Sequence, residues 1–269
     1  MADPDEGVAA DGTIRTGARR DRVPAIFEPV MTDAVAFAGK SAAGTSAPAS
    51  LYVYGSVANG TAHPGSSDVD LLSIGLENAA ILGQRLSARY ADRCRGVEVA
   101  AATAADFAGD SDAAYGFRVF LRHYCVHLAG PDPSTKLPAF AADFRAARGF
   151  NGDLGQHLGQ WRQELAQGEV AADLIGVRAA RKTLLAVAGL VSVRDGIWTT
   201  GRAGAAWRWS ELEPGRATGL GELHSWADSQ CHPSRAEVER VLGDDGIVCA
   251  IVARFASLIG LWTDGLEGQ

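Results

Sequence analysis

The sequence has few cysteines for its 269 residues, and they lie far apart. The four are Cys94, Cys125, Cys231 and Cys249, and no two form a C-x-x-C pair. This spacing argues against a disulfide scaffold and against a structural zinc site. The six histidines likewise lack the spacing of metal ligands. We therefore expect a protein of a reducing compartment.

Long hydrophobic runs are also missing. The apolar stretch 184–193 is too short to span a bilayer, and the stretch 247–262 carries Arg254 in its middle. The first residues are small and acidic, without the apolar segment of a secretion signal. These features predict a soluble, cytoplasmic protein with no membrane partner.

A surplus of positive charge is absent too. The chain has 25 basic and 32 acidic residues, for a net charge of −7, and neither half is basic overall. Proteins that bind nucleic acid generally need a basic face to neutralise phosphates, so the balance disfavours a nucleic-acid partner, although a local patch can defy net charge. Hydrophobic residues make up 47% and charged residues 21%, which is ordinary for a globular chain of one large or two modest domains.

The pattern along the chain predicts an α+β fold, in which a small mixed-sheet domain precedes an all-α helical bundle. Residues 1–22 lack periodicity and are expected to form a flexible tail. The sheet domain is expected over 23–133 and the helical domain over 134–269, with Pro131 and Pro133 at the border. We expect the protein to be a monomer.

Individual elements follow from hydrophobic periodicity. In the first domain we expect helices over 23–37 and 79–94, strands over 51–54, 68–74 and 97–103, and a loop of small residues over 39–50. In the second we expect helices over 137–148, 154–167, 171–193, 199–212, 220–229 and 234–262, the last broken near 243–246.

The chemistry is concentrated in residues 51–75, L-Y-V-Y-G-S-V-A-N-G-T-A-H-P-G-S-S-D-V-D-L-L-S-I-G. A buried strand ends at Gly55 and Ser56, where glycine permits close backbone approach and a helix N-terminus can bind phosphate. The next strand opens with Asp68 and Asp70, which are two apart and so project from the same face. Paired carboxylates repel unless a cation lies between them, and a hard divalent ion such as Mg2+ suits them.

This arrangement resembles the signature of the DNA polymerase β nucleotidyltransferase superfamily. Within it, the chain is most similar to the streptomycin/spectinomycin type of aminoglycoside adenylyltransferase, which also has a helical C-terminal domain. Asn59 departs from the basic residue that many members carry, and residues 101–117 contain no counterpart of the family's drug-contacting tryptophan.

The resemblance implies roles for residues outside the motif. Glu98 matches a third acidic residue, which serves as general base or metal ligand. Arg181 and Arg202 match basic residues that contact the nucleotide phosphates, and Lys182 or Arg178 could share that role. Asp173 lies near the position of a family carboxylate that binds the aminoglycoside, with a helix first-turn acid as the alternative interpretation.

The predicted activity is Mg-dependent transfer of a nucleoside monophosphate, by default AMP from ATP, to a hydroxyl of a small-molecule acceptor. Asp68, Asp70 and Glu98 would hold two Mg2+ ions, and an aminoglycoside acceptor would imply antibiotic resistance. Two alternatives stay open: a toxin-type enzyme that modifies tRNA or protein, and a non-catalytic nucleotide-binding protein.

Overall fold

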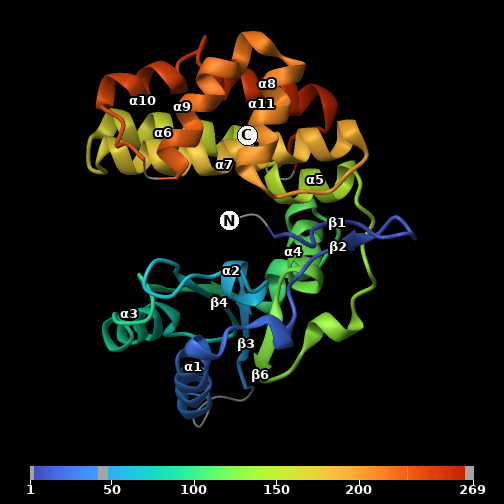
Figure 1. Ribbon diagram of the computed structural model, residues 1–269, viewed down its shortest axis with the longest axis vertical. Coiled ribbons are helices and arrows are strands. Elements are labelled where there is room, and N and C mark those ends of the chain that lie inside the picture. The colour runs from blue at the N-terminus through green and yellow to red at the C-terminus, as the bar shows by residue number, and fades with distance from the viewer. Residues whose placement is uncertain (1–2, 42–47, 229, 264–269) are drawn as a thin grey trace. The chain divides into compact units, whose positions relative to one another are not determined.

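The structure is a computed structural model that describes residues 3–41, 48–228 and 230–263, with its helices and strands labelled in Figure 1. Half of the expected loop over 39–50, residues 42–47, lies outside this part of the chain, and residues 39–41 belong to a helix instead. The chain divides into two compact units. The N-terminal unit comprises residues 1–9, 13–110 and 117–140, and the helical unit comprises 10–12, 111–116 and 141–269.

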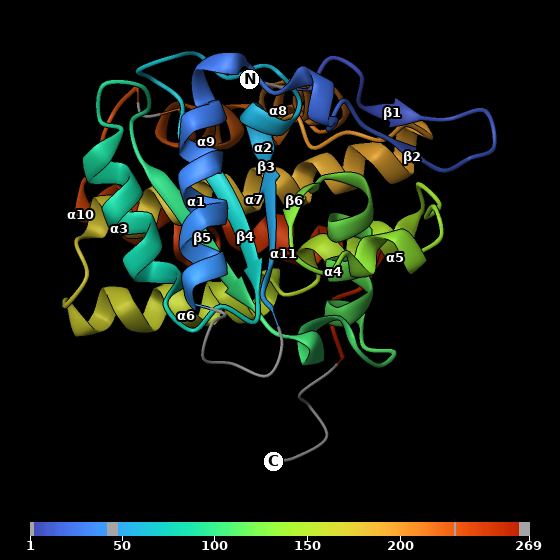
Figure 2. The ribbon, with the colours of Figure 1, turned by 90° about the horizontal axis from the view of Figure 1, so that it is seen from below.

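The N-terminal unit is built on a four-stranded sheet in the order β5-β4-β3-β6 (Figure 2). The strands are β3 Ser50–Tyr54, β4 Val69–Ile74, β5 Val97–Ala102 and β6 Val126–Ala129. Strand β3 pairs antiparallel with β4 and β6, whereas β4 and β5 are parallel. The parallel pair needs a crossover, which α3 (Ala79–Arg89) provides.

Both faces of this sheet are covered. Helices α1 (Glu28–Ser41) and α3 lie over one face, where they bury a cluster that includes Phe27, Met31, Leu51, Val53, Leu71, Leu82 and Leu86 (Figure 2). On the opposite face Tyr52 and Leu72 pack with Leu121 of α4 (Asp112–His123). Since strand side chains alternate, Asp70 and Glu98 belong to this second face.

Residues 3–22 differ from the expected flexible tail. Strand β1 (Gly7–Val8) pairs antiparallel with β2 (Ile14–Arg15), and Ile14 is buried. The turn between them includes Gly12, whose φ of 84° favours glycine. A hairpin with two-residue strands leaves no periodicity in the sequence, which explains the wrong expectation.

Several short elements complete the N-terminal unit. They are η1 Arg20–Arg22, η2 Ala25–Phe27, α2 Gly55–Ala58, η4 Ala104–Phe107 and η5 Pro133–Lys136. Of these, α2 is the single turn that follows strand β3. The backbone N–H of Arg19 donates to the carbonyl of Ala58 at 3.1 Å, so the N-terminal segment supports this turn.

The helical unit is organised around α7 (Ala172–Asp195), a helix with buried residues along most of its length. The other helices are α5 Phe144–Asn151, α6 Leu154–Gln167, α8 Arg202–Leu212, α9 Ala217–Ala227, α10 Arg235–Leu242 and α11 Ile247–Leu258, with η6 Pro214–Arg216 between α8 and α9. All six helices contact α7. The expected fold class, a small mixed sheet followed by a helical region, is confirmed.

Helix ends in this unit follow local sequence. Asp143 caps α5 by accepting from the N–H of Ala146, and Ser234 and Glu237 form a capping box at α10. Helix α7 ends at Gly196, which adopts the left-handed conformation. Within the described ranges, none of the helices combines the length and the apolar character that a bilayer crossing requires.

Candidate active site

Three neighbouring strands place the central side chains of the site in one row. Tyr54 at the end of β3 is the cross-strand partner of Asp70, and Asp70 is the partner of Glu98 on β5. Directly paired residues on one face have Cβ atoms about 4.5–5.5 Å apart. The parallel register of β4 and β5 therefore brings together two carboxylates that are 28 positions apart in the sequence.

The bend after β3 lies directly against Asp70. Gly55 has a φ of +69°, and a Cβ atom added there would lie 2.6 Å from Oδ2 of Asp70. Two features therefore favour glycine at this position: the positive φ angle and the close approach of the Asp70 carboxylate. The hydroxyl of the next residue, Ser56, has no hydrogen-bond partner among the residues that the structure describes. The glycine–serine bend and the strand acid therefore form one site.

Asp70 lies in a strongly unfavourable environment for a charged group. Burial, together with the negative charges of Glu98 and Asp68 and against the opposing charge of Arg95, raises the pKa of its carboxyl to about 6. Burial also raises the pKa of Tyr54, and the negative charges of Asp70 and Glu98 contribute in the same direction. A carboxylate with this excess of negative charge around it attracts a cation.

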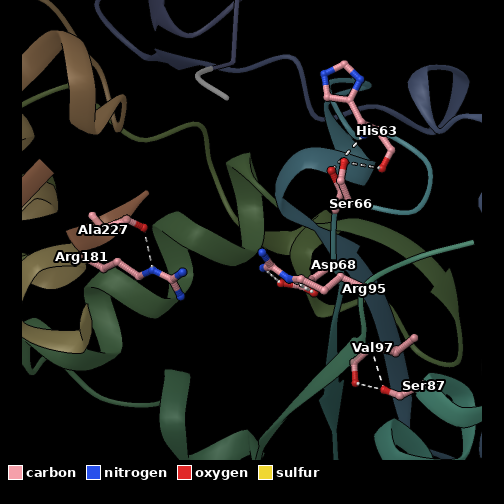
Figure 3. Close-up of polar contacts among 9 residues, drawn as sticks. His63, Ser66, Asp68, Ser87, Arg95, Val97, Arg181 and Ala227 are labelled. Carbon is pink, nitrogen blue, oxygen red and sulfur yellow. Dashed lines mark hydrogen bonds and ion pairs between the residues drawn. The ribbon is translucent and has the colours of Figure 1, made fainter. Parts of the chain in front are cut away.

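Asp68 precedes β4 and already has a cationic partner. Its Oδ1 accepts from Nε of Arg95 at 3.0 Å, and its Oδ2 accepts from Nη2 of the same guanidinium (Figure 3). The Asp68 side chain is 20% exposed, and that of Arg95 is 59% exposed. Glu98 is exposed on β5. The acids thus differ: Asp70 is largely enclosed, Asp68 is paired and Glu98 is open.

The three acids have the oxygen ligands that Mg2+ prefers. In residues 3–41, 48–228 and 230–263, however, no group of three histidine, cysteine or acidic side chains converges closely enough to hold a metal ion. Both oxygens of Asp68 are engaged by the Arg95 guanidinium. The carboxylate chemistry of the donor set thus fits a divalent cation, but Asp68 already has a cationic partner.

Two residues that the sequence analysis did not identify support this site. Ser87 on α3 accepts from the N–H of Val97 at 2.8 Å and donates to its carbonyl at 3.2 Å, which fixes the start of β5 next to Glu98 (Figure 3). Arg95 lies three residues before Glu98. A basic residue just before an acid-bearing strand is the signal that could have identified it.

In the helical unit, Arg181 and Arg202 lie close enough to repel each other. Burial lowers the pKa of Arg202, and the positive charge of Arg181 lowers it further, against the attraction of Asp228. Nε of Arg181 donates to the carbonyl of Ala227 at 3.2 Å (Figure 3). Within the described part of the chain, neither arginine forms an ion pair with an acidic side chain. Two unneutralised guanidinium groups are suited to an anion.

The other basic candidates have partners. Nζ of Lys182 lies 2.7 Å from Oδ1 of Asp153 and donates to the carbonyl of Phe150 at 2.9 Å. Arg178 pairs with Glu164 at 2.5 Å. These contacts give Lys182 and Arg178 structural roles within the helical unit.

Asp173 lies in the first turn of α7, as expected for an acid that interacts favourably with a helix N-terminus. Its Oδ1 accepts from the N–H of Leu174 at 2.9 Å, and its Oδ2 lies 3.5 Å from Nδ1 of His232. Its side chain is 37% exposed, so it is accessible to a cationic group.

Part of the N-terminal unit resembles a known protein family. Residues 40–103 match the family model described as a nucleotidyltransferase domain. The matched range contains Gly55, Ser56, Asp68, Asp70 and Glu98, and it ends before the helical unit. No curated protein matches the chain.

Proposed function

We propose that this chain, a nucleotidyltransferase by its matched domain, transfers a nucleoside monophosphate from an NTP to a hydroxyl of a small molecule. We take ATP as the donor, an aminoglycoside as the first acceptor to test, and Mg2+ as the required cation. In the reaction, a bond forms between the acceptor oxygen and the α-phosphorus. The bond from the α-phosphorus to the bridging oxygen breaks, and pyrophosphate leaves.

The single observation that supports this proposal most strongly is the position of Asp70. It lies against Gly55 and is the cross-strand partner of Glu98, and burial with the nearby negative charges of Glu98 and Asp68 raises its pKa, which is consistent with a site for a cation. A structural aspartate at this depth would be expected to have a hydrogen-bonded or charged partner of its own. A divalent ion would supply that charge.

We propose that Asp68, Asp70 and Glu98 hold two Mg2+ ions. The metal, when bound, polarises phosphate oxygens and lowers the pKa of a bound hydroxyl. The chain supplies the remaining functions. Gly55 lets the backbone approach the phosphates. The hydroxyl of Ser56, which has no partner among the described residues, donates to a phosphate oxygen, and the exposed Glu98 accepts the proton of the acceptor hydroxyl.

For the helical unit we propose anion binding by Arg181 and Arg202, with the triphosphate as the anion. Their mutual repulsion and the lack of acidic partners support this role, which the sequence analysis also assigned to Lys182. The pairing of Lys182 with Asp153 leaves the arginines as the better candidates. The exposed Asp173 is proposed to bind an amino group of the acceptor.

The test is Mg2+-dependent release of pyrophosphate from each NTP, first with a panel of aminoglycosides and then with tRNA. The variant Asp70→Asn removes the central charge and should abolish turnover. Asp92→Asn removes a carboxylate whose side chain is 74% exposed, and it should leave turnover unchanged. Release with tRNA alone would replace the small-molecule acceptor with a macromolecular one. Retained turnover in the Asp70→Asn variant would overturn the mechanism.

A further inference from the structure

Arg95 forms an ion pair with Asp68, one of the three acids of the site. Its guanidinium engages both oxygens of Asp68, at 3.0 Å between Nε and Oδ1 and through a second contact between Nη2 and Oδ2 (Figure 3). This parallel, two-bond geometry is the strongest way in which an arginine binds a carboxylate. Both Asp68 oxygens, which would bind a metal, thus already accept a hydrogen bond from Arg95.

The backbone holds the two partners in register. The N–H of Arg95 donates to the carbonyl of Ser67 at 3.0 Å, and the N–H of Val69 donates to the carbonyl of Gly96 at 2.9 Å. These two bonds join the residues on either side of Asp68 to Arg95 and to the residue that follows it. The pair therefore follows from how β4 and β5 begin, and not from a chance meeting of two surface side chains.

The positive charge of Arg95 also interacts with the charges of Glu98 and Asp70. The hydrogen bond to Asp68 is the main cause that raises the pKa of Arg95, and the charges of Glu98 and Asp70 contribute in the same direction. Conversely, Arg95 is the cation that opposes the rise in the pKa of Asp70. One positive group therefore acts on all three carboxylates.

We propose that Arg95 is a positioning residue that occupies the cation position on Asp68 until a divalent metal ion replaces it. The inference rests on the proposed function only in that a metal binds these acids. The contact holds the Asp68 side chain in place while the site is metal-free. Release is possible because the Arg95 side chain is 59% exposed and can extend into water. Arg95 therefore competes with the metal.

The experiment measures Mn2+ binding to the full chain by electron paramagnetic resonance, with no nucleotide present. Arg95→Gln removes both the charge and the guanidinium fork, and it should tighten Mn2+ binding about two- to fivefold. Arg95→Lys keeps the charge but leaves one Asp68 oxygen free, so its affinity should lie between those of the native protein and Arg95→Gln. Arg85→Gln removes an exposed guanidinium from α3 and is the matched control for loss of charge.

A double variant tests the contact between Arg95 and Asp68 directly. In a protein that already carries Asp68→Asn, the change Arg95→Gln should give no gain in Mn2+ affinity, because the carboxylate for which Arg95 competes is gone. Equal or weaker binding by the single variant Arg95→Gln would overturn the inference. An Arg95→Lys variant that binds Mn2+ as the native protein does would also overturn it, since loss of charge alone would then explain the tighter binding of Arg95→Gln.

The outcome can be separated from the proposed function. If no form of the protein binds Mn2+, the metal site itself is wrong, and the inference fails with it. If the native protein binds Mn2+ but Arg95→Gln does not improve binding, only the role of Arg95 fails. If Mn2+ binding improves while no acceptor supports pyrophosphate release, the role of Arg95 stands and the proposed reaction fails.

Discussion

Gly55 and Asp70 are packed so closely that a single added carbon atom would collide with the carboxylate, since a Cβ on Gly55 would lie 2.6 Å from Oδ2 of Asp70. Gly55 directly follows β3, and Asp70 on the neighbouring antiparallel strand β4 is the cross-strand partner of Tyr54, the residue before the glycine. The contact joins the backbone bend to the central acid. A side chain added at Gly55 would therefore displace the Asp70 carboxylate.

Gly55→Ala should therefore lose activity out of proportion to its loss of stability. The new methyl group must displace the Asp70 carboxylate, and misplacing a catalytic group by about 1 Å can cost about 100-fold in rate. Gly65→Ala is the matched control, because Gly65 has a similar φ of +75° but nothing within 4 Å of its added Cβ. Both variants should lose about 1–2 kcal/mol of unfolding free energy through the backbone conformation. Equal turnover in the two variants would argue against the contact.

Asp70→Asn should stabilise the metal-free protein while it abolishes turnover. The folded pKa of about 6 lies above the reference of 3.8, so the folded state binds the proton more tightly than the unfolded state. Stability is therefore highest below the unfolded pKa and falls as the pH rises through about 6. The asparagine variant avoids this loss, so above that pH its free energy of unfolding should exceed that of the native protein by up to about 3 kcal/mol.

Chemical denaturation at several pH values checks this prediction. The advantage of Asp70→Asn should vanish below the unfolded pKa of 3.8, where the native carboxyl is protonated in both states. Added Mg2+ should stabilise the native protein and leave the variant unaffected, since only the native site gains from metal binding. An advantage that is constant across the pH range would contradict the proposed environment of Asp70.

The sequence predicts the sheet and the bundle well because their signals are local. The strand expected at 51–54 is found at Ser50–Tyr54, and the helix expected at 154–167 is found at Leu154–Gln167. The break expected near 243–246 separates α10 from α11. The helix expected from residue 137 begins instead at Phe144, because Pro138 interrupts the segment and Asp143 provides the cap.

The site was predicted as a set of residues but not as a set of partners. Local spacing placed Asp68 and Asp70 on one face, and the family resemblance added Glu98. The ion pairs of Asp68 with Arg95 and of Lys182 with Asp153 join positions 27 and 29 residues apart. Such contacts depend on strand register and helix packing, which no local pattern encodes. For this reason Lys182 looked available in sequence although it has a partner in the structure.

Ile14→Ala tests whether the N-terminal segment is part of the folded unit. Ile14 is 4% exposed in β2, so truncation should cost about 2–4 kcal/mol of unfolding free energy. Ile26→Ala makes the same change at a side chain that is 40% exposed, and it should cost no more than about 0.5 kcal/mol. Chemical denaturation measures both. Equal, small losses would restore the interpretation of residues 3–22 as a flexible tail.

Arg202→Gln should weaken nucleotide binding without weakening the fold. Burial and the neighbouring Arg181 already disfavour the charge of Arg202 in the free protein, so its removal should leave the melting temperature unchanged or raise it. A lost hydrogen bond from a charged group to a phosphate should raise the nucleotide Kd about tenfold or more. Arg181→Gln should weaken binding in the same way, and Arg216→Gln, at an exposed position of η6, is the control for charge.

Titration calorimetry with a non-hydrolysable NTP and thermal unfolding of the same samples separate two roles for Arg202. A binding role moves the Kd and spares the melting temperature. A purely structural role lowers the melting temperature and leaves the Kd of the remaining folded protein unchanged. Rising salt should reduce the difference between the native protein and Arg202→Gln, because screening weakens the attraction that only the native side chain provides. A native-like Kd in both Arg181→Gln and Arg202→Gln would exclude this arginine pair from nucleotide binding.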